Sequence, residues 1–149
     1  MTRKTISLVA LAGALAVAGP ALALSFVHHM NDSLTVTPVH YDGHCPGLIT
    51  FHGKVHVTGD FQPGSTVEIG YQFSRSDGAT GENKFFNVSH DGDYDITDTW
   101  TLGGPPNVEH YDGWEHFKSW VTDSAQGGAK GGPGTVWSNK ASFTLVCKK

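Results

Sequence analysis

The sequence predicts an all-β protein, an antiparallel β-sandwich of about seven strands, because that number of short strands in roughly 100 residues is typical of two packed sheets. The first observation behind this prediction is that apolar and polar residues alternate with a period of two in several segments. The second is that glycine and proline turns separate these segments, as at Pro63-Gly64 and Asp91-Gly92. The third is that no segment shows sustained helical periodicity.

Four segments carry the clearest alternation: 45–57, 67–73, 94–102 and 141–147. Each predicts a half-buried strand, because successive side chains of a strand point to opposite faces. Asp98 is an exception, since it lies on the apolar side of the third segment. The sets expected to face the core are Ile49, Phe51, Val55 and Val57, then Val67, Ile69, Tyr71 and Phe73, then Tyr94, Ile96, Trp100 and Leu102, and finally Ala141, Phe143, Leu145 and Cys147.

Two further strands are predicted, at 85–89 and 114–122, and the alternation leaves their buried faces open. Each contains large apolar residues on both faces, so one set in each strand must point away from the core. The opposing sets are Phe85 against Phe86 in the first strand, and Trp114 with Trp120 against Phe117 with Val121 in the second.

The first 23 residues have the pattern of a cleaved signal peptide. Arg3 and Lys4 form a short positive region, the run 6–18 carries no charge, and Ala21-Leu22-Ala23 is a sequence that signal peptidase accepts. The apolar run is shorter than the ~20 residues of a membrane-spanning helix. We therefore expect a secreted protein, periplasmic in a Gram-negative source, with no membrane anchor after cleavage. The alternative is an uncleaved anchor.

The expected organisation is a signal peptide at 1–23, an N-terminal extension at 24–44 and one β-sandwich domain at 45–149. Residues 34–37 of the extension have strand character, and they either add to a sheet edge or stay loose. Within the domain, residues 125–134 contain five glycines and a proline, which predicts a mobile loop.

Cys45 and Cys147 are the only cysteines, and an even pair in an exported chain predicts a disulfide. The bond would close a loop of about 100 residues, for which chain entropy gives at most roughly 4–5 kcal/mol of stabilisation. A reactive thiol or a metal site is the competing interpretation, and the absence of a C-x-x-C motif disfavours it.

The charge of the chain argues against two classes of partner. Loss of Arg3 and Lys4 with the signal peptide leaves 8 basic against 14 acidic residues, a net charge of −6. This charge argues against nucleic acid, whose binding depends on clustered Lys and Arg. It argues against adsorption to anionic lipid for the same reason.

Several spacings are shared with a known group of proteins. They are Cys45-Pro46, Tyr71-x-Phe73-x-Arg75-Ser76-Asp77-Gly78-Ala79, Trp100-Thr101-Leu102-Gly103, Gly113-Trp114 and Ser138-Asn139-Lys140-Ala141-x-Phe143-x-Leu145-x-Cys147. Between Cys45 and Cys147 the chain resembles small secreted bacterial domains with an immunoglobulin-like or fibronectin-III-like sandwich bounded by a first and a last cysteine. The resemblance implies this fold and export, and it implies no activity and no site.

Nine histidines make metal binding the alternative function to consider. His52 and His56 share one strand face, but they lie about 13 Å apart by strand rise, too far for one metal to bridge. Asp91, Asp93 and Asp95 resemble the start of a calcium loop, yet Ile96 stands where that loop needs glycine. No cofactor is predicted, and a histidine-based metal site stays open.

The tetrapeptide His-Tyr-Asp-Gly occurs twice, at 40–43 and at 110–113. Asp-Gly is a favoured turn pair, and coincidence is a sufficient explanation in a chain rich in these residues. The functional hypothesis is that two equivalent loops grip one ligand.

Catalysis is not expected, and no catalytic residue is assigned. Serine, histidine and aspartate are all present, but the sequence contains no G-x-S-x-G motif around a nucleophile. A small hydrolase is therefore the weakest alternative.

The aromatic residues provide the candidate binding surface, formed by Trp114, Trp120 and Tyr111. Exposed tryptophans beside polar turns suit a protein partner or a stacked sugar ring. The competing interpretation is that both tryptophans fill the core. We expect a non-catalytic extracellular binding or interaction module whose partner is a protein or a carbohydrate.

Overall fold

The computed structural model describes residues 24–103, 109–122 and 133–148. Within these ranges it contains nine β-strands and no helix, and so no helix there has the length and hydropathy to cross a membrane. The predicted signal peptide at 1–23 and most of the predicted loop at 125–134 lie outside the described residues.

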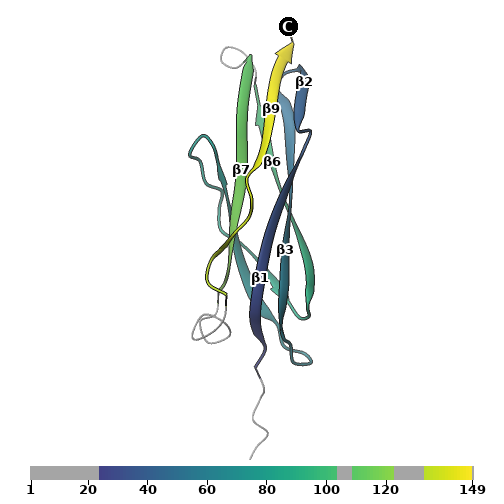
Figure 1. The fold of residues 1–149 in the computed structure, drawn as a ribbon, viewed down its shortest axis with the longest axis vertical. Helices are drawn as coiled ribbons and strands as arrows, with labels where there is room; N and C mark the ends of the chain where they lie inside the picture. Colours follow the sequence, from purple (N-terminus) through teal and green to yellow (C-terminus); the bar gives the residue numbers. More distant parts are fainter. Residues whose placement is uncertain (1–23, 104–108, 123–132, 149) are drawn as a thin grey trace, which may run out of the picture.

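The strands form two sheets packed against each other (Figure 1). The three-stranded sheet has the order β1-β3-β6, with β1 at Phe26–Thr37, β3 at Gly47–Asp60 and β6 at Gly92–Leu102. The six-stranded sheet has the order β2-β9-β7-β4-β5, with β8 beside β7, and its strands are β2 (His40–His44), β4 (Val67–Arg75), β5 (Lys84–Val88), β7 (His110–Val121), β8 (Val136–Trp137) and β9 (Ala141–Lys148).

The predicted all-β sandwich is confirmed, with nine described strands in place of about seven. Almost all strand pairs are antiparallel, and the exception among the described strands is β2, which runs parallel to β9. β2 is also the strand that residues 40–44, expected in the extension, contribute to the six-stranded sheet.

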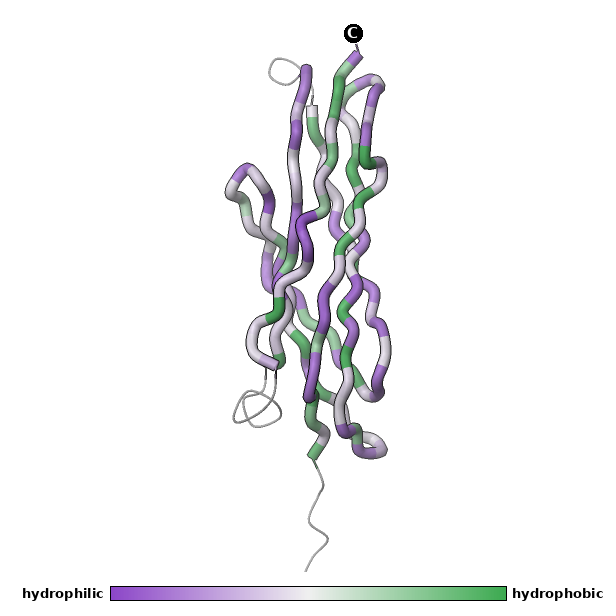
Figure 2. The backbone as a smooth tube through the Cα atoms, in the orientation of Figure 1, coloured by the Kyte–Doolittle hydropathy of each residue, from purple (hydrophilic) through white to green (hydrophobic). Residues whose placement is uncertain are grey.

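The core lies between the sheets and contains most of the apolar sets that the alternation predicts. Ile49, Phe51, Val55 and Val57 of β3 are completely buried. Figure 2 shows hydrophobic and hydrophilic residues alternating along this part of the chain. Four predicted core residues are only partly buried and pack against the margin of the core: Tyr71, Tyr94, Leu102 and Cys147.

The structure decides the two faces that the alternation left open. In β7, Phe117 is completely buried, and the half-buried Trp114 and Trp120 point to the outside of the six-stranded sheet. In β5, the ring of Phe86 contacts Tyr94 on the inner side, and Phe85 is 54% exposed.

The N-terminal extension contributes a strand that is longer than the predicted segment 34–37. All of 26–37 forms β1, which adds to the edge of the three-stranded sheet by pairing with β3. The side chain of Asn139 caps this edge strand, because its amide group donates to the carbonyl of Leu34 and accepts from the Leu34 N–H, both at 2.9 Å. This contact occupies one pair of outward backbone groups that an edge strand otherwise leaves open to another chain.

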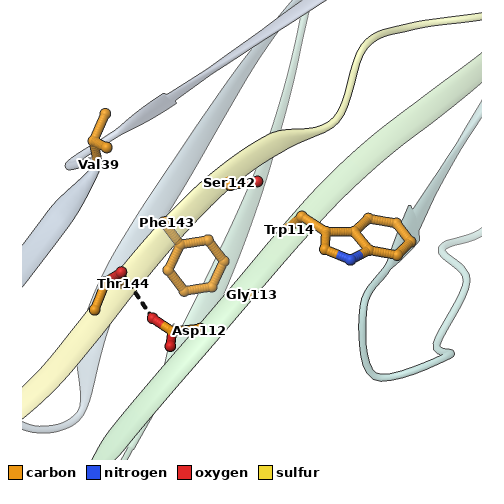
Figure 3. Close-up of a pocket in the computed structure, with 7 residues that line it drawn as sticks. All are labelled: Val39, Asp112, Gly113, Trp114, Ser142, Phe143 and Thr144. Atoms are coloured by element: carbon orange, nitrogen blue, oxygen red, sulfur yellow. Dashed lines mark hydrogen bonds between the residues drawn. The ribbon is translucent and has the colours of Figure 1, made fainter.

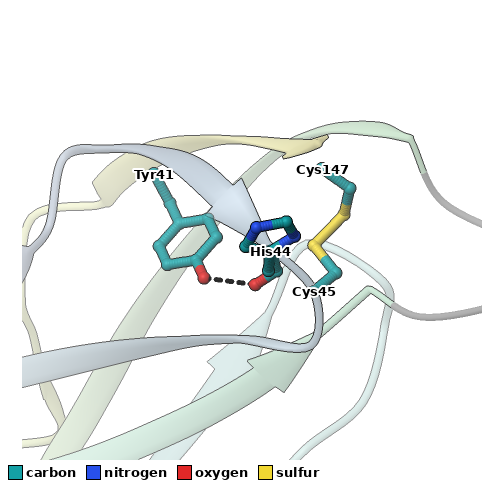
Figure 4. Close-up of a disulfide and its surroundings, with 4 residues drawn as sticks. All are labelled: Tyr41, His44, Cys45 and Cys147. Carbon is teal, nitrogen blue, oxygen red and sulfur yellow. Dashed lines mark hydrogen bonds between the residues drawn. A yellow bond between two sulfur atoms is a disulfide. The ribbon is translucent and has the colours of Figure 1, made fainter. Parts of the chain in front are cut away.

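Cys45 and Cys147 form the predicted disulfide (Figure 4). Cys45 lies between β2 and β3 and Cys147 lies in β9, so the bond connects the start of the three-stranded sheet to the six-stranded sheet. Close to the disulfide, the Tyr41 hydroxyl donates a hydrogen bond to the carbonyl of His44, which ties β2 to the same corner.

Candidate binding face

The outer surface of the six-stranded sheet carries a continuous group of aromatic and cationic side chains. The odd-numbered positions of β7 from 113 to 119 are buried, so the even-numbered side chains from 114 to 120 point outward. We call the following residues the aromatic face: Trp114, His116, Lys118 and Trp120 of β7, Trp137 of β8, Phe85 of β5, and Lys140.

At one end of the aromatic face the indole of Trp120 lies across the sheet over Gly70 of β4. The two residues are paired in register, and a Cβ atom at Gly70 would lie 2.5 Å from the indole. Glycine is therefore the residue that lets the indole lie flat on the sheet. The ring of Phe85 meets Trp120 edge to face, with centroids 6.4 Å apart.

In the middle of the aromatic face, Lys118 and His116 connect the tryptophans. Lys118 Nζ lies 5.6 Å from the ring centroid of Trp120 and 5.9 Å from that of Trp137. The His116 imidazole lies 4.8 Å from the Trp137 ring and 5.1 Å from the Trp114 ring, between centroids. The rings and the lysine thus form an uninterrupted row along β7.

The ionisation of His116 depends on this setting. Partial burial lowers its pKa below that of a free histidine, and the positive charge of Lys140 acts in the same direction. Lys140 Nζ itself lies 3.8 Å from the centroid of the Trp114 ring, within the range of a cation–π contact. His116 is consequently a neutral ring at neutral pH.

A groove of about 380 Å³ adjoins Trp114 on the same side of the sheet (Figure 3). Asp112 accepts a hydrogen bond from the Thr144 hydroxyl at 2.8 Å, and its second oxygen lies 3.1 Å from His110 Nε2. Both contacts lower the pKa of Asp112, that from Thr144 more strongly, so its carboxylate is ionised. The residues that line the groove are Val39, Asp112, Gly113, Trp114, Ser142, Phe143 and Thr144.

Of the three residues in the predicted binding surface, the structure brings together two. Trp114 and Trp120 lie on the aromatic face, at the two ends of the outward part of β7. Tyr111 lies on the opposite side of β7, where its ring contacts Trp100 and Phe143 and its hydroxyl lies 3.1 Å from Ser76 Oγ. Tyr111 therefore packs beside the core instead of joining the tryptophans.

Trp137 and Phe85 belong to the aromatic face and escaped sequence reasoning. Trp137 is 51% exposed in the two-residue strand β8, too short to show alternation. The signal for Phe85 was present, because one of two adjacent phenylalanines in a strand must face outward. Its position beside Trp120 depends on the pairing of β5 with β4 and of β4 with β7, which only the fold supplies.

The described residues contain no group of three or more His, Cys, Asp or Glu side chains arranged to hold a metal. His56 contacts Asp93 at 2.6 Å, and Lys54 donates to the same carboxylate at 2.9 Å. Asp91, at the start of the calcium-like segment, instead accepts a hydrogen bond from the Gly59 N–H.

The two His-Tyr-Asp-Gly tetrapeptides lie in strands, not in loops. One forms most of β2 and the other begins β7, and both pair with β9 from opposite sides. Tyr41 and Tyr111 are paired with the same residue, Leu145. The two copies thus lie in the two strands that flank β9. β2 runs parallel to β9, and β7 runs antiparallel to it.

Two buried carboxyl groups lie inside the sandwich, on Asp32 of β1 and Glu115 of β7. None of their four oxygens, nor Ser119 Oγ beside them, has a hydrogen-bond partner among the described residues. Burial raises the pKa of Asp32 to about 6, against a smaller lowering effect of Ser119. Burial, reinforced by the neighbouring carboxyl group of Asp98, raises the pKa of Glu115 to about 8. Glu115 is completely buried, so a dissolved substrate cannot contact it.

The sequence matches no family model, and neither a curated protein nor a solved structure is similar enough to count as a match. The assignment of a function therefore depends on the aromatic face and on the groove next to it.

Proposed function

We propose that this chain is an exported, immunoglobulin-like module that binds without catalysis, and that its ligand is an extended carbohydrate lying along the aromatic face. One observation carries the proposal: three indoles and a phenyl ring lie on the same outer surface, although a soluble domain usually buries such side chains. The disulfide is compatible with export to an oxidising compartment, as the N-terminal sequence predicts.

The geometry of the face favours a long, ring-containing ligand. Outward side chains recur about every 6.7 Å along a strand, so Trp114 and Trp120 are separated by roughly 20 Å. This length accommodates several sugar rings in a row. Indole rings offer flat apolar surfaces to the C–H faces of sugars, and they do so with little loss of side-chain freedom on binding.

The groove beside Trp114 supplies polar groups at one end of the face. The ionised Asp112 carboxylate and the hydroxyl groups of Ser142 and Thr144 are next to the indole. A few polar groups set against an apolar wall are the usual composition of a small-molecule site. We assign to the groove the hydrogen bonds that orient the end of the chain.

The experiment is a binding panel of soluble neutral and acidic polysaccharides, measured by calorimetry and by quenching of tryptophan fluorescence. Trp114→Ala and Trp120→Ala should each weaken binding roughly thirtyfold, corresponding to about 2 kcal/mol for the loss of a buried aromatic contact. The matched controls are Thr35→Ala and Thr99→Ala on the outer surface of the three-stranded sheet, which should bind as the unaltered protein does.

Two results would reject the proposal. One is the absence of binding across the panel. The other is an equal loss of affinity in the tryptophan variants and the threonine controls. The non-catalytic part is tested separately, because the chain length of a bound polysaccharide should stay constant during prolonged incubation with the protein.

A further inference from the structure

We infer that the carbohydrate bound by the aromatic face is anionic, with its negative groups lying against Lys118 and Lys140. The inference rests on the proposed function and specifies its ligand. It is argued from the charges of the aromatic face, where Lys118 and Lys140 are both positive, whereas the chain as a whole has a net charge of −4.

The lysines of the aromatic face have aromatic neighbours, whereas Lys54 and Lys148 have carboxylate partners. Lys54 pairs with Asp93 and Lys148 pairs with Asp42, both at 2.9 Å. Lys118 and Lys140 form no salt bridge among the described residues, and their ammonium groups lie over indole rings. A cation that lies over a ring and has no carboxylate partner is free to pair with a charge on the ligand.

The centre of this surface also lacks acidic side chains among the described residues. Between Trp114 and Trp120, the outward residues of β7 and of its neighbours are aromatic, basic, amide, hydroxyl or glycine, as in Gly70, Gln72 and Ser74 of β4. Among the outward residues of β4 and β7, acidic groups occur only towards the two ends, at Glu68 and Asp112, where each accepts a hydrogen bond from a threonine.

This arrangement gives the bound chain a direction. The ionised Asp112 would repel a carboxylate or a sulfate, so the groove takes the neutral, hydroxyl-bearing end of the chain. The anionic groups then lie further along β7, between Trp114 and Trp120, where both ammonium groups are in reach. The ring faces stack and the charges pair in the same complex.

The probes are chosen as pairs with the same sugar rings and different charge. Polygalacturonate is compared with its fully methyl-esterified form, and dextran sulfate with dextran, so that the arms distinguish carboxylate from sulfate. We expect the anionic member of at least one pair to bind tenfold or more tightly, a factor equivalent to ~1.4 kcal/mol. We also expect its affinity to fall as salt concentration rises, because exposed charges are screened.

Variants connect this preference to the two lysines. Lys118→Gln and Lys140→Gln should each reduce the ratio of affinities for the charged and uncharged members. Lys54→Gln is the matched control, because it removes a lysine from the outer surface of the opposite sheet. An unchanged ratio in both lysine variants would overturn the inference.

The outcomes separate this inference from the proposed function. Equal binding of charged and uncharged members overturns the anionic ligand and leaves carbohydrate binding in place. No binding to any member overturns both. An oligothymidylate of similar length is included, and a single-stranded nucleic acid that bound more tightly than every polysaccharide would replace carbohydrate as the ligand class.

Discussion

β3 and β7 are long strands inside the two sheets, and they distribute their side chains differently. In β3 every inward position from 49 to 57 is apolar or glycine, and the outward positions from 52 to 56 are His or Lys. β7 buries Glu115 and Ser119 on either side of Phe117, and its tryptophans point outward. β3 thus follows the ordinary rule for a half-solvated strand, and β7 reverses it at four positions.

The two outer surfaces also differ in whether their charged side chains are paired within the protein. Outside β3, the side chains of Lys54 and His56 share the carboxylate of Asp93, so this surface is neutralised within the protein. Outside β7, Lys118 forms no salt bridge among the described residues, and its ammonium group lies over two indole rings. Departures from the local rules of folding concentrate at functional sites. The comparison therefore supports the proposal that the ligand binds at the β7 surface.

The largest expected effect on stability comes from truncating a completely buried phenylalanine in each of the two strands. Phe117→Ala and Phe51→Ala should each lower the free energy of unfolding by about 3–5 kcal/mol, because both rings are completely buried. The two variants should differ in their dependence on pH. Phe117→Ala opens space two residues from Glu115, which lets water reach that carboxyl group and weakens the effect of its burial.

Urea unfolding of both variants at pH 5 and pH 8 measures this difference. The dependence of stability on pH should shrink in Phe117→Ala and persist in Phe51→Ala. Phe117→Leu is the milder substitution should the alanine variant not fold. The free energy of unfolding could instead depend on pH identically in Phe51→Ala and in the Phe117 variant studied. That result would contradict the view that the pH dependence comes from the carboxyl group buried beside Phe117.

The second effect is a gain of stability in Glu115→Gln. The folded protein keeps the proton on Glu115 up to a pKa of about 8, whereas the unfolded chain releases it near the ordinary value of 4.5. The folded state therefore binds more protons between these values, and the free energy of unfolding falls as pH rises through this window. The loss amounts to about 3 kcal/mol between pH 4 and pH 7.

Glu115→Gln should remove this part of the pH dependence, so its stability relative to the unaltered protein should rise from pH 4 to pH 7. Thermal unfolding followed by circular dichroism across that range measures the difference. Glu82→Gln is the matched control, because the Glu82 side chain is exposed. A constant difference between Glu115→Gln and the unaltered protein would show that Glu115 titrates normally.

The sequence was sufficient to predict the sandwich, the disulfide and the interior of β3, because these follow from local alternation and from cysteine count. It was not sufficient for the site. Alternation predicts that Trp114 and Trp120 share a face. The predicted strand began at residue 114, however, so it did not separate Tyr111, which the structure places on the other face. Residues that join the face through strand pairing, such as Trp137, have no local signal.

The buried acids show a second limit. Asp98 falls on the apolar parity of its strand, and this irregularity is visible in the sequence. That it lies beside Glu115 of the opposite sheet depends on how the two sheets pack, and period-two patterns contain no information on that packing.

A smaller effect distinguishes two glycines, Gly53, which faces the core, and Gly70, which lies under the aromatic face. A Cβ atom at Gly53 of β3 would lie 2.7 Å from Ile96 Cγ1 and 3.0 Å from Phe117 Cε1, inside the core. Gly53→Ala should therefore cost about 1–3 kcal/mol by overpacking. Gly70→Ala should cost below about 1 kcal/mol, because its clash is with the half-buried Trp120 indole, which can swing towards solvent.

The readouts of these two variants should be opposite. Gly70→Ala should shift tryptophan emission to longer wavelength and weaken polysaccharide binding, with a nearly unchanged melting temperature. Gly53→Ala should lower the melting temperature and leave the affinity of the folded protein intact. If Gly70→Ala bound as the unaltered protein does, the flat position of Trp120 would be irrelevant to the ligand.

The smallest effect tests whether the charges on the outer surface of β7 act on one another. The pKa of His116 is lowered first by partial burial and then by the charge of Lys140, so Lys140→Gln should raise it towards that of a free histidine. An NMR titration of the imidazole measures this directly, with Lys54→Gln as the control on the other sheet.

In the unaltered protein, protonation of His116 adds a third positive charge to the face as pH falls. Affinity for an anionic chain should then increase below the ordinary histidine range, and in Lys140→Gln that increase should begin at higher pH. A His116 pKa that did not move in Lys140→Gln would mean that solvent screens the two groups from each other. The aromatic face would then bind its ligand through ring stacking, without charges that reinforce one another.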